Sequence, residues 1–128
     1  MVVARGRIYI LGGTLSSQKV RYGRTLASVE RYDPDADAWE AVAHMVTRRF
    51  GLAAAVLGDK LYAIGGKGAE GVVGTVDIFD GSEWLTARSP APEMPTKRVH
   101  LAAAAFRGKI YAVGGLCNAG KAHERPRH

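Results

Sequence analysis

Short apolar runs recur along the chain, and each is followed by a turn signal. Leu52–Leu57 and Leu101–Phe106 are unbroken apolar runs, a pattern typical of strands that are covered on both faces. Gly58-Asp59 and Arg107-Gly108 follow these runs and have the composition of two-residue hairpin turns. We therefore expect pairs of antiparallel strands joined by tight turns.

The second strand of each pair belongs to a phrase that occurs three times. Its copies are Arg7–Gly13, Lys60–Gly66 and Lys109–Gly115, each an apolar stretch around a tyrosine that ends in two glycines. The second glycine of the pair lies at positions 13, 66 and 115, so successive copies are 53 and 49 residues apart. A phrase that returns at a period near 50 indicates a repeated structural unit.

Two further phrases recur in the same frame. Arg48–Ala55 matches Lys97–Ala104, and Ser28–Asp33 matches Thr75–Asp80. The second of these phrases alternates apolar and polar residues, as a half-buried strand does, and a strand with a tryptophan follows it. A four-stranded antiparallel meander repeated in this way is the unit of a β-propeller. We predict an all-β fold, a partial propeller of four-stranded blades without helices.

The two tryptophans are expected to anchor the blades. Trp39 and Trp84 are large enough to pack between adjacent blades, with Tyr32 and Phe79 as their neighbours. The distance from Tyr32 to Trp39 is seven positions, whereas Phe79 to Trp84 is five. The turn Asp80–Ser82 should therefore form a tighter hairpin than its counterpart in the first repeat.

The repeats divide the chain into segments. They are a first repeat at 1–51 with a truncated innermost strand, a second at 52–100, the two inner strands of a third at 101–116, and a basic tail at 117–128. A propeller needs about four to eight blades to close, and this chain holds roughly two and a half at a period near 50. We expect a fragment whose open blade edges are exposed, with self-association through those edges as one way of covering them.

Composition places the chain among ordinary folded proteins. It has 128 residues, of which 47% are apolar and 23% charged, enough for one compact unit. A single cysteine, Cys117, excludes an intrachain disulfide. The longest uncharged apolar run, Leu52–Gly58, is too short to cross a bilayer, and the N-terminus lacks a signal-peptide pattern. We expect a cytoplasmic protein without a membrane partner.

The net charge of +6 is unevenly distributed. Residues 1–29 contain five basic residues and no acidic one, and the tail adds Lys121, Arg125 and Arg127. A nucleic-acid surface would interleave aromatic residues with such charges for base stacking, and only Tyr22 does so here. The distribution favours solvated loops over a nucleic-acid partner.

The order of double glycine, Tyr-Asp and tryptophan resembles the kelch repeat. Ile8–Gly13, Val29–Pro34 and Met45–Arg49 are most similar to the kelch-like (BTB-kelch) substrate adaptors, and the resemblance extends from about Arg7 to Gly115. It implies a kelch-type propeller that binds a client protein. In a longer parent, a BTB region absent here would connect that client to a cullin-type ubiquitin ligase. The alternatives are a fragment of a kelch-type enzyme and a cytoskeletal or structural kelch protein.

The paired glycines have a structural interpretation. Glycine adopts backbone angles closed to other residues and lets blades approach closely. A phosphate cradle would need a following helix and a Lys-Ser/Thr pair, which the sequence lacks. The residues concerned are Gly12, Gly13, Gly65, Gly66, Gly114 and Gly115.

The resemblance also implies which residues bind a partner. Kelch-like adaptors use the residue after the double glycine and the basic residue before the innermost strand, at the mouth of the propeller channel. These positions are Thr14, Lys67, Leu116, Arg49 and Arg98, with His100 as a further candidate because it replaces the glycine found at position 51. An arginine fork suits the carboxylates of an acidic peptide. The alternative is that the two arginines form ion pairs within the blades or stay solvated.

Two long connections could add partner specificity or serve as spacers. Thr14–Leu26 and Lys67–Gly74 are the longest stretches that we expect to be irregular.

The sequence offers no catalytic constellation. Neither a Ser-His-Asp arrangement nor a pair of acidic residues placed for acid–base chemistry is present. Cys117, His123 and His128 have a spacing that matches no zinc-site pattern. We predict a non-enzymatic module without a cofactor or metal.

Overall fold

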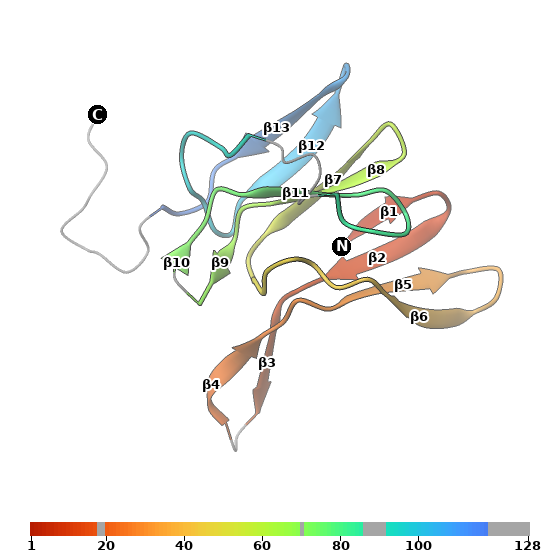
Figure 1. The fold of residues 1–128 in the computed structure, drawn as a ribbon, viewed down its shortest axis with the longest axis horizontal. Coiled ribbons are helices and arrows are strands. Elements are labelled where there is room, and N and C mark those ends of the chain that lie inside the picture. Colours follow the sequence, from red (N-terminus) through yellow and green to blue (C-terminus); the bar gives the residue numbers. More distant parts are fainter. Residues whose placement is uncertain (18–19, 70, 86–91, 118–128) are drawn as a thin grey trace.

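The computed structural model describes residues 1–17, 20–69, 71–85 and 92–117. All regular structure in these ranges is β-strand, arranged in five antiparallel sheets, of which three are successive propeller blades and two are hairpins in the connections (Figure 1). No helix that could span a bilayer occurs in this part of the chain. The prediction of an all-β, unclosed propeller is confirmed.

The first blade has four strands in the order β1-β2-β5-β6. Their bounds are β1 (Val2–Ala4), β2 (Arg7–Leu11), β5 (Val29–Asp33) and β6 (Ala38–Val42). Tyr32 of β5 pairs with Ile8 on one side and with Trp39 on the other, so the Tyr-Asp phrase forms the third strand. The innermost strand is the short β1, at the start of the chain.

The second blade has three full strands in the order β11-β8-β7. Their bounds are β7 (Ala53–Leu57), β8 (Lys60–Ile64) and β11 (Val76–Phe79). Of the strand expected around Trp84, the described residues contain a bridge between Phe79 and Trp84 and a backbone bond from the Leu85 N–H to the Ile78 carbonyl at 2.7 Å. The turn before it is tight, because the Asp80 N–H donates to the Glu83 carbonyl at 3.1 Å. The shorter spacing from Phe79 to Trp84 thus corresponds to a tight hairpin turn, as predicted, and residues 86–91 that follow lie outside the described residues.

The third blade consists of β12 (Ala102–Phe106) and β13 (Lys109–Val113). The apolar run of β12 was expected to be covered on both faces, but all its residues except Ala103 are exposed. This prediction is wrong, since no further described blade packs on β12 and β13. Among the described residues, β13 has no strand partner on its outer edge.

Both connections predicted to be irregular form hairpins instead. The first contains β3 (Thr14–Ser17) and β4 (Val20–Thr25), and the second contains β9 (Lys67–Gly68) and β10 (Gly71–Val72). Backbone bonds close both hairpins beside the double glycines, from the Leu26 N–H to the Gly13 carbonyl at 2.8 Å and from the Val73 N–H to the Gly66 carbonyl at 2.9 Å. These strands were not predicted because glycine and polar residues in both connections interrupt the alternation of apolar and polar positions.

Apolar side chains from neighbouring blades form the core. The ring of Phe79 meets that of Tyr9 edge-on, with centroids 6.1 Å apart, between the first and second blades. Trp84 extends this contact, because its indole Nε1 donates to the Ala43 carbonyl of the first blade at 2.9 Å. Trp84 therefore lies between two blades, as expected.

Trp39 differs from Trp84. Its ring packs on Tyr32, with centroids 5.2 Å apart, but 52% of the residue is exposed. Trp39 thus does not pack between blades in this structure, contrary to the expectation, because no described blade precedes the first one.

The double glycines have left-handed backbone angles. Their φ values lie between +60° and +103° at positions 12, 13, 65, 66, 114 and 115. At Gly65, an added Cβ would lie 2.7 Å from the Arg98 carbonyl oxygen. Glycine at this position therefore lets the segment that enters the third blade cross the end of β8.

Candidate functional site

Backbone hydrogen bonds join successive blades at the double-glycine ends of β2 and β8. The Gly13 N–H donates to the Arg49 carbonyl at 2.9 Å, and the Gly66 N–H donates to the Arg98 carbonyl at 2.7 Å. Each connecting segment is thereby fixed across the end of the blade that it leaves. We call this end of the blades the glycine-end face.

The residues after the double glycines are held in the same way. Lys67 exchanges two backbone bonds with Phe50, of 2.9 and 3.1 Å, and Leu116 exchanges two with Val99, both of 2.8 Å. Leu116 is 57% exposed, and Lys67 is half-buried. Thr14 stands at the same point of the first blade, where it begins β3 and pairs with Thr25. The three positions thus head the connections at one end of the molecule.

His100 joins Lys67 and Leu116 on this face. Its N–H donates to the Gly51 carbonyl at 2.6 Å, and its exposed ring lies 6.2 Å from the Phe50 ring between centroids. Its φ of +59° repeats the +66° of Gly51, although histidine has a Cβ. A positive φ is uncommon for a residue with a Cβ and costs energy. Residues strained in this way are frequent at binding sites.

Arg49 does not lie on the accessible surface. It is fully buried, and its Nη1 donates to the Gly65 carbonyl at 2.9 Å and to the Thr75 hydroxyl at 3.0 Å. Its Nη2 donates to the carboxylate of Asp77 in β11, which is also buried. Burial lowers the pKa of the guanidinium, and the Asp77 charge opposes that shift.

The buried position of Arg49 corrects its expected role. A partner cannot reach a guanidinium that is enclosed by the second blade, so the partner contact predicted for Arg49 does not fit the structure. The alternative fits, since Arg49 forms an ion pair inside the fold.

Arg98 repeats only part of this arrangement. Its Nη1 donates to the Gly114 carbonyl at 2.9 Å, the same bond that Arg49 makes to Gly65. Arg98 is half-buried and has no ion pair among the described residues, because they include no third strand in its blade. Its guanidinium is accessible.

Arg48 is a residue that the sequence reasoning missed. It is exposed and lines a cavity of about 440 Å³ with Thr47, Gly68 and Val73, beside the β9–β10 hairpin. Adjacent residues of an extended chain point to opposite sides. Because Arg49 points inward, Arg48 points outward, and the Arg-Arg pair in the sequence could have indicated this alternation.

The structure shows no cluster suited to metal binding within the ranges that it describes. No three His, Cys, Asp or Glu side chains come together there. Cys117 is a free, exposed thiol, whereas His123, His128 and the rest of the basic tail lie outside the described residues.

Comparison with known proteins identifies the repeats. The family profile described as Kelch motif matches residues 1–46 and 48–91. An F-box/kelch-repeat protein of Arabidopsis thaliana is 31% identical over an alignment of 101 residues, which covers 70% of this chain and 23% of that protein. Kelch-like protein 35 of Mus musculus is 38% identical over an alignment of 95 residues, which covers 72% of this chain and 15% of that protein.

A solved structure shares the fold. The structure of YjhT covers 89% of this chain with a TM-score of 0.75 at 17% sequence identity, and the chain corresponds to 43% of it. The chain spans less than a quarter of the length of the two relatives above. With two successive kelch motifs in residues 1–91, the chain belongs to the kelch-repeat family.

Proposed function

We propose that this chain is a protein-interaction module that binds a client protein through the glycine-end face. One observation carries the proposal: Lys67, His100 and Leu116 present their side chains from positions fixed by backbone bonds between and within blades. A rigid scaffold that holds varied side chains at its loop ends is the usual design of a binding surface. Kelch repeats and kelch-like relatives support the same class of function.

The chemistry of this face suits an acidic segment with an apolar side chain. Arg48 and Lys67 supply positive charge, and Leu116 supplies exposed apolar surface. The Arg48 guanidinium can donate two hydrogen bonds to a carboxylate. Lys67 adds long-range attraction that speeds encounter with an acidic partner.

We further propose that the client is recruited to a ubiquitin ligase, as in the substrate adaptors that the repeats resemble. The relatives include proteins named Kelch-like and F-box/kelch-repeat, which supports an adaptor. A cullin-type ligase would be engaged by a region of a longer parent protein.

A cytoplasmic location fits the free thiol of Cys117, because a reducing compartment keeps such a group unpaired.

Selection from a displayed library of random peptides tests the binding face. The chain should enrich acidic peptides, and Lys67→Glu should weaken their capture at least tenfold. Lys60→Glu is the matched control, because the same charge reversal then lies on an exposed residue at the opposite end of β8. Equal losses in both variants, or no enrichment of acidic peptides, would refute the assignment.

A further inference from the structure

A cleft beside Arg48 lies between two connections of the second repeat. One side is the segment that leads into β7, and the other is the β9–β10 hairpin with the residue that follows it; the cavity between them measures about 440 Å³. Ligand pockets in proteins have volumes from about 300 Å³ upward. Besides the buried Arg49, the residues that line the cleft are Val46, Thr47, Arg48, Gly68, Ala69 and Val73.

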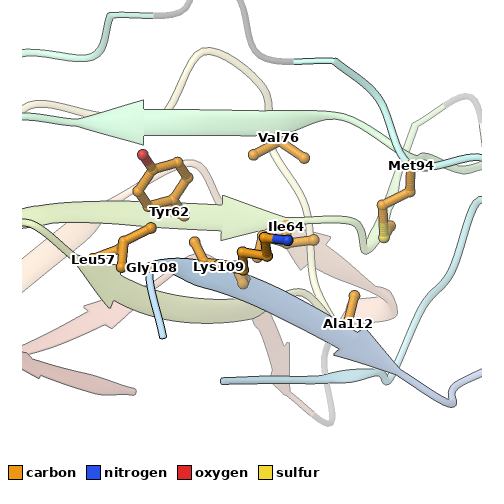
Figure 2. A pocket seen from close by; sticks show the side chains of 9 residues that line it. Leu57, Tyr62, Ile64, Val76, Met94, Gly108, Lys109 and Ala112 are labelled. Atoms are coloured by element: carbon orange, nitrogen blue, oxygen red, sulfur yellow. The ribbon is translucent and has the colours of Figure 1, made fainter. Parts of the chain in front are cut away.

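Another cavity, also of about 440 Å³, has a different origin. It lies between the second and third blades, where Tyr62, Ile64, Val76 and Ala112 line it (Figure 2). These residues come from β8, β11 and β13, so this cavity belongs to the packing of two blades. The cleft beside Arg48 is bounded by connections instead, and connections on a rigid scaffold are where binding residues concentrate.

Backbone contacts hold the two sides of the cleft in place. Phe50 and Lys67 exchange two hydrogen bonds of 2.9 and 3.1 Å, which join the base of one side to the base of the other. Gly68 lies so close to the opposite side that an added Cβ would be 2.9 Å from the Arg48 carbonyl oxygen. A cleft that is already formed in the free protein binds a side chain without the entropy cost of ordering its walls.

The walls of the cleft are mostly aliphatic. Val46 is 61% exposed although it is apolar, Ala69 on the other side is exposed as well, and Val73 is half-buried. Among the described residues that line the cleft there is no aromatic side chain and no carboxylate. The cleft therefore offers neither ring stacking nor a partner for a cation, and its walls favour an aliphatic side chain.

Arg48 determines what lies beside that side chain. Its residue is exposed, it lines the cleft together with Thr47, and within the described part of the chain it forms no ion pair. A guanidinium forms strong paired hydrogen bonds with a carboxylate. Lys67, next to Gly68, adds positive charge on the other side of the cleft. A residue adjacent to the aliphatic side chain should therefore be acidic.

We propose that the cleft is the anchor site for one aliphatic side chain of the client protein, such as leucine, and that an acidic residue next to it pairs with Arg48. This inference rests on the client-binding face proposed above, and it adds the class of residue that the face selects. A side chain enclosed in a pocket, with polar groups around the rim, is the usual arrangement of the few residues that supply most of the binding energy of an interface.

Two fluorescein-labelled peptides, Gly-Glu-Leu-Glu-Gly and Gly-Glu-Ala-Glu-Gly, test the anchor site by fluorescence anisotropy. The leucine peptide should bind saturably and at least about tenfold more tightly than the alanine peptide, because it buries additional methyl and methylene groups. Gly-Gln-Leu-Gln-Gly should bind at least about tenfold more weakly than the leucine peptide with glutamates, because Arg48 then lacks a carboxylate partner.

Variants of the protein assign these preferences to the cleft. Ala69→Leu fills the cleft with a side chain of the protein itself, so it should remove the preference for leucine while the alanine peptide still binds. Ala41→Leu is the matched control, because Ala41 is an exposed residue of β6 that does not line the cleft, and it should leave both affinities unchanged. Arg48→Gln should remove the preference for glutamate over glutamine and keep the preference for leucine.

The outcomes separate this inference from the client-binding proposal. If the leucine and alanine peptides bind equally, or if Ala69→Leu keeps the leucine preference, the anchor site is wrong while the client-binding face stands. If Ala69→Leu weakens both peptides to the same extent, the cleft holds an anionic group instead of an aliphatic side chain, and the inference is overturned. If neither acidic peptide binds, both proposals fail.

Discussion

Arg49 and Asp77 form an ion pair that is closed off from solvent in the second blade, and it joins the entering segment to the third strand of the blade. Arg49 is also bonded to Gly65 and Thr75, so one guanidinium connects the end of β8, the start of β11 and the interblade segment. The pair is therefore part of how the second blade is assembled.

Removing one member of this pair should be costly. Arg49→Ala leaves the Asp77 carboxylate buried without its cation, and we expect a loss of about 3–5 kcal/mol in the free energy of unfolding. Arg98→Ala is the matched control, because Arg98 is half-buried and has no ion pair among the described residues, so its loss should be below about 1 kcal/mol. Urea denaturation of both variants measures the difference.

The double variant Arg49→Met with Asp77→Leu tests whether the ion pair stabilises the fold or whether its attraction only offsets the cost of burying the two charges. Replacing both charges by apolar side chains should recover most of the stability that Arg49→Ala loses. If Arg49→Ala and Arg98→Ala cost the same, the burial of Arg49 has no energetic consequence and the interpretation is wrong.

Replacing the two tryptophans by alanine should also reduce the free energy of unfolding by different amounts. Trp84→Ala removes a half-buried ring between blades and its bond to Ala43, and we expect a loss of about 2–3 kcal/mol, somewhat below that of a fully buried aromatic residue. Trp39→Ala removes an exposed ring and should cost less than about 1 kcal/mol. Thermal unfolding followed by circular dichroism compares them, and a larger loss for Trp39→Ala would contradict the assigned packing.

The repeat pattern predicted the blades well because it reflects local geometry. Double glycines, Tyr-Asp phrases and apolar runs report backbone angles and strand alternation, and these depend on near neighbours along the chain. The same pattern placed Trp39 and Trp84 in equivalent roles, although one has a preceding blade and the other does not. Equivalent sequence positions receive different burial when the neighbouring blade differs.

The site residues were harder to predict for a related reason. Arg49 and Arg98 occupy the same repeat position, but β11 with Asp77 encloses Arg49, whereas no third strand among the described residues covers Arg98. The pairing of side chains 28 positions apart is not visible in local composition. The β9–β10 hairpin was missed because its strands have two residues each, too few to show alternation.

The stability of the first blade should depend on pH through the ionisation of Asp33. Partial desolvation by itself would raise the pKa of this carboxyl, but the N–H groups of Ala36 and Asp35, at 3.4 and 3.0 Å, and the Arg7 charge outweigh it and lower the pKa. A carboxylate whose pKa is lowered by folding stabilises the protein above its unfolded pKa of about 3.9, and that stability is lost as pH falls through the lower, folded value.

Asp33→Asn is therefore expected to be less stable than wild type at pH 7 and to approach it below pH 3. Glu93→Gln removes an exposed carboxylate elsewhere and serves as the control for a general effect of charge. Denaturant midpoints at the two pH values provide the measurement. A constant difference between Asp33→Asn and wild type at all pH values would contradict the role of ionisation.

His100→Gly should stabilise the protein and weaken client capture at the same time. The φ of +59° at His100 is unfavourable for a residue with a Cβ, and glycine relieves it at the price of some unfolded-state entropy, so we expect a net gain of about 0.5–1 kcal/mol. Gly51→Ala is the reverse change at the equivalent position, where an added Cβ would lie 2.5 Å from Val99 Cγ2, and it should destabilise the protein.

Loss of the His100 ring should reduce capture of the selected acidic peptides, since an exposed side chain held in a costly conformation is expected to contribute to binding. Calorimetry and peptide titration on both variants provide the comparison, and a less stable His100→Gly would show that its backbone is not strained.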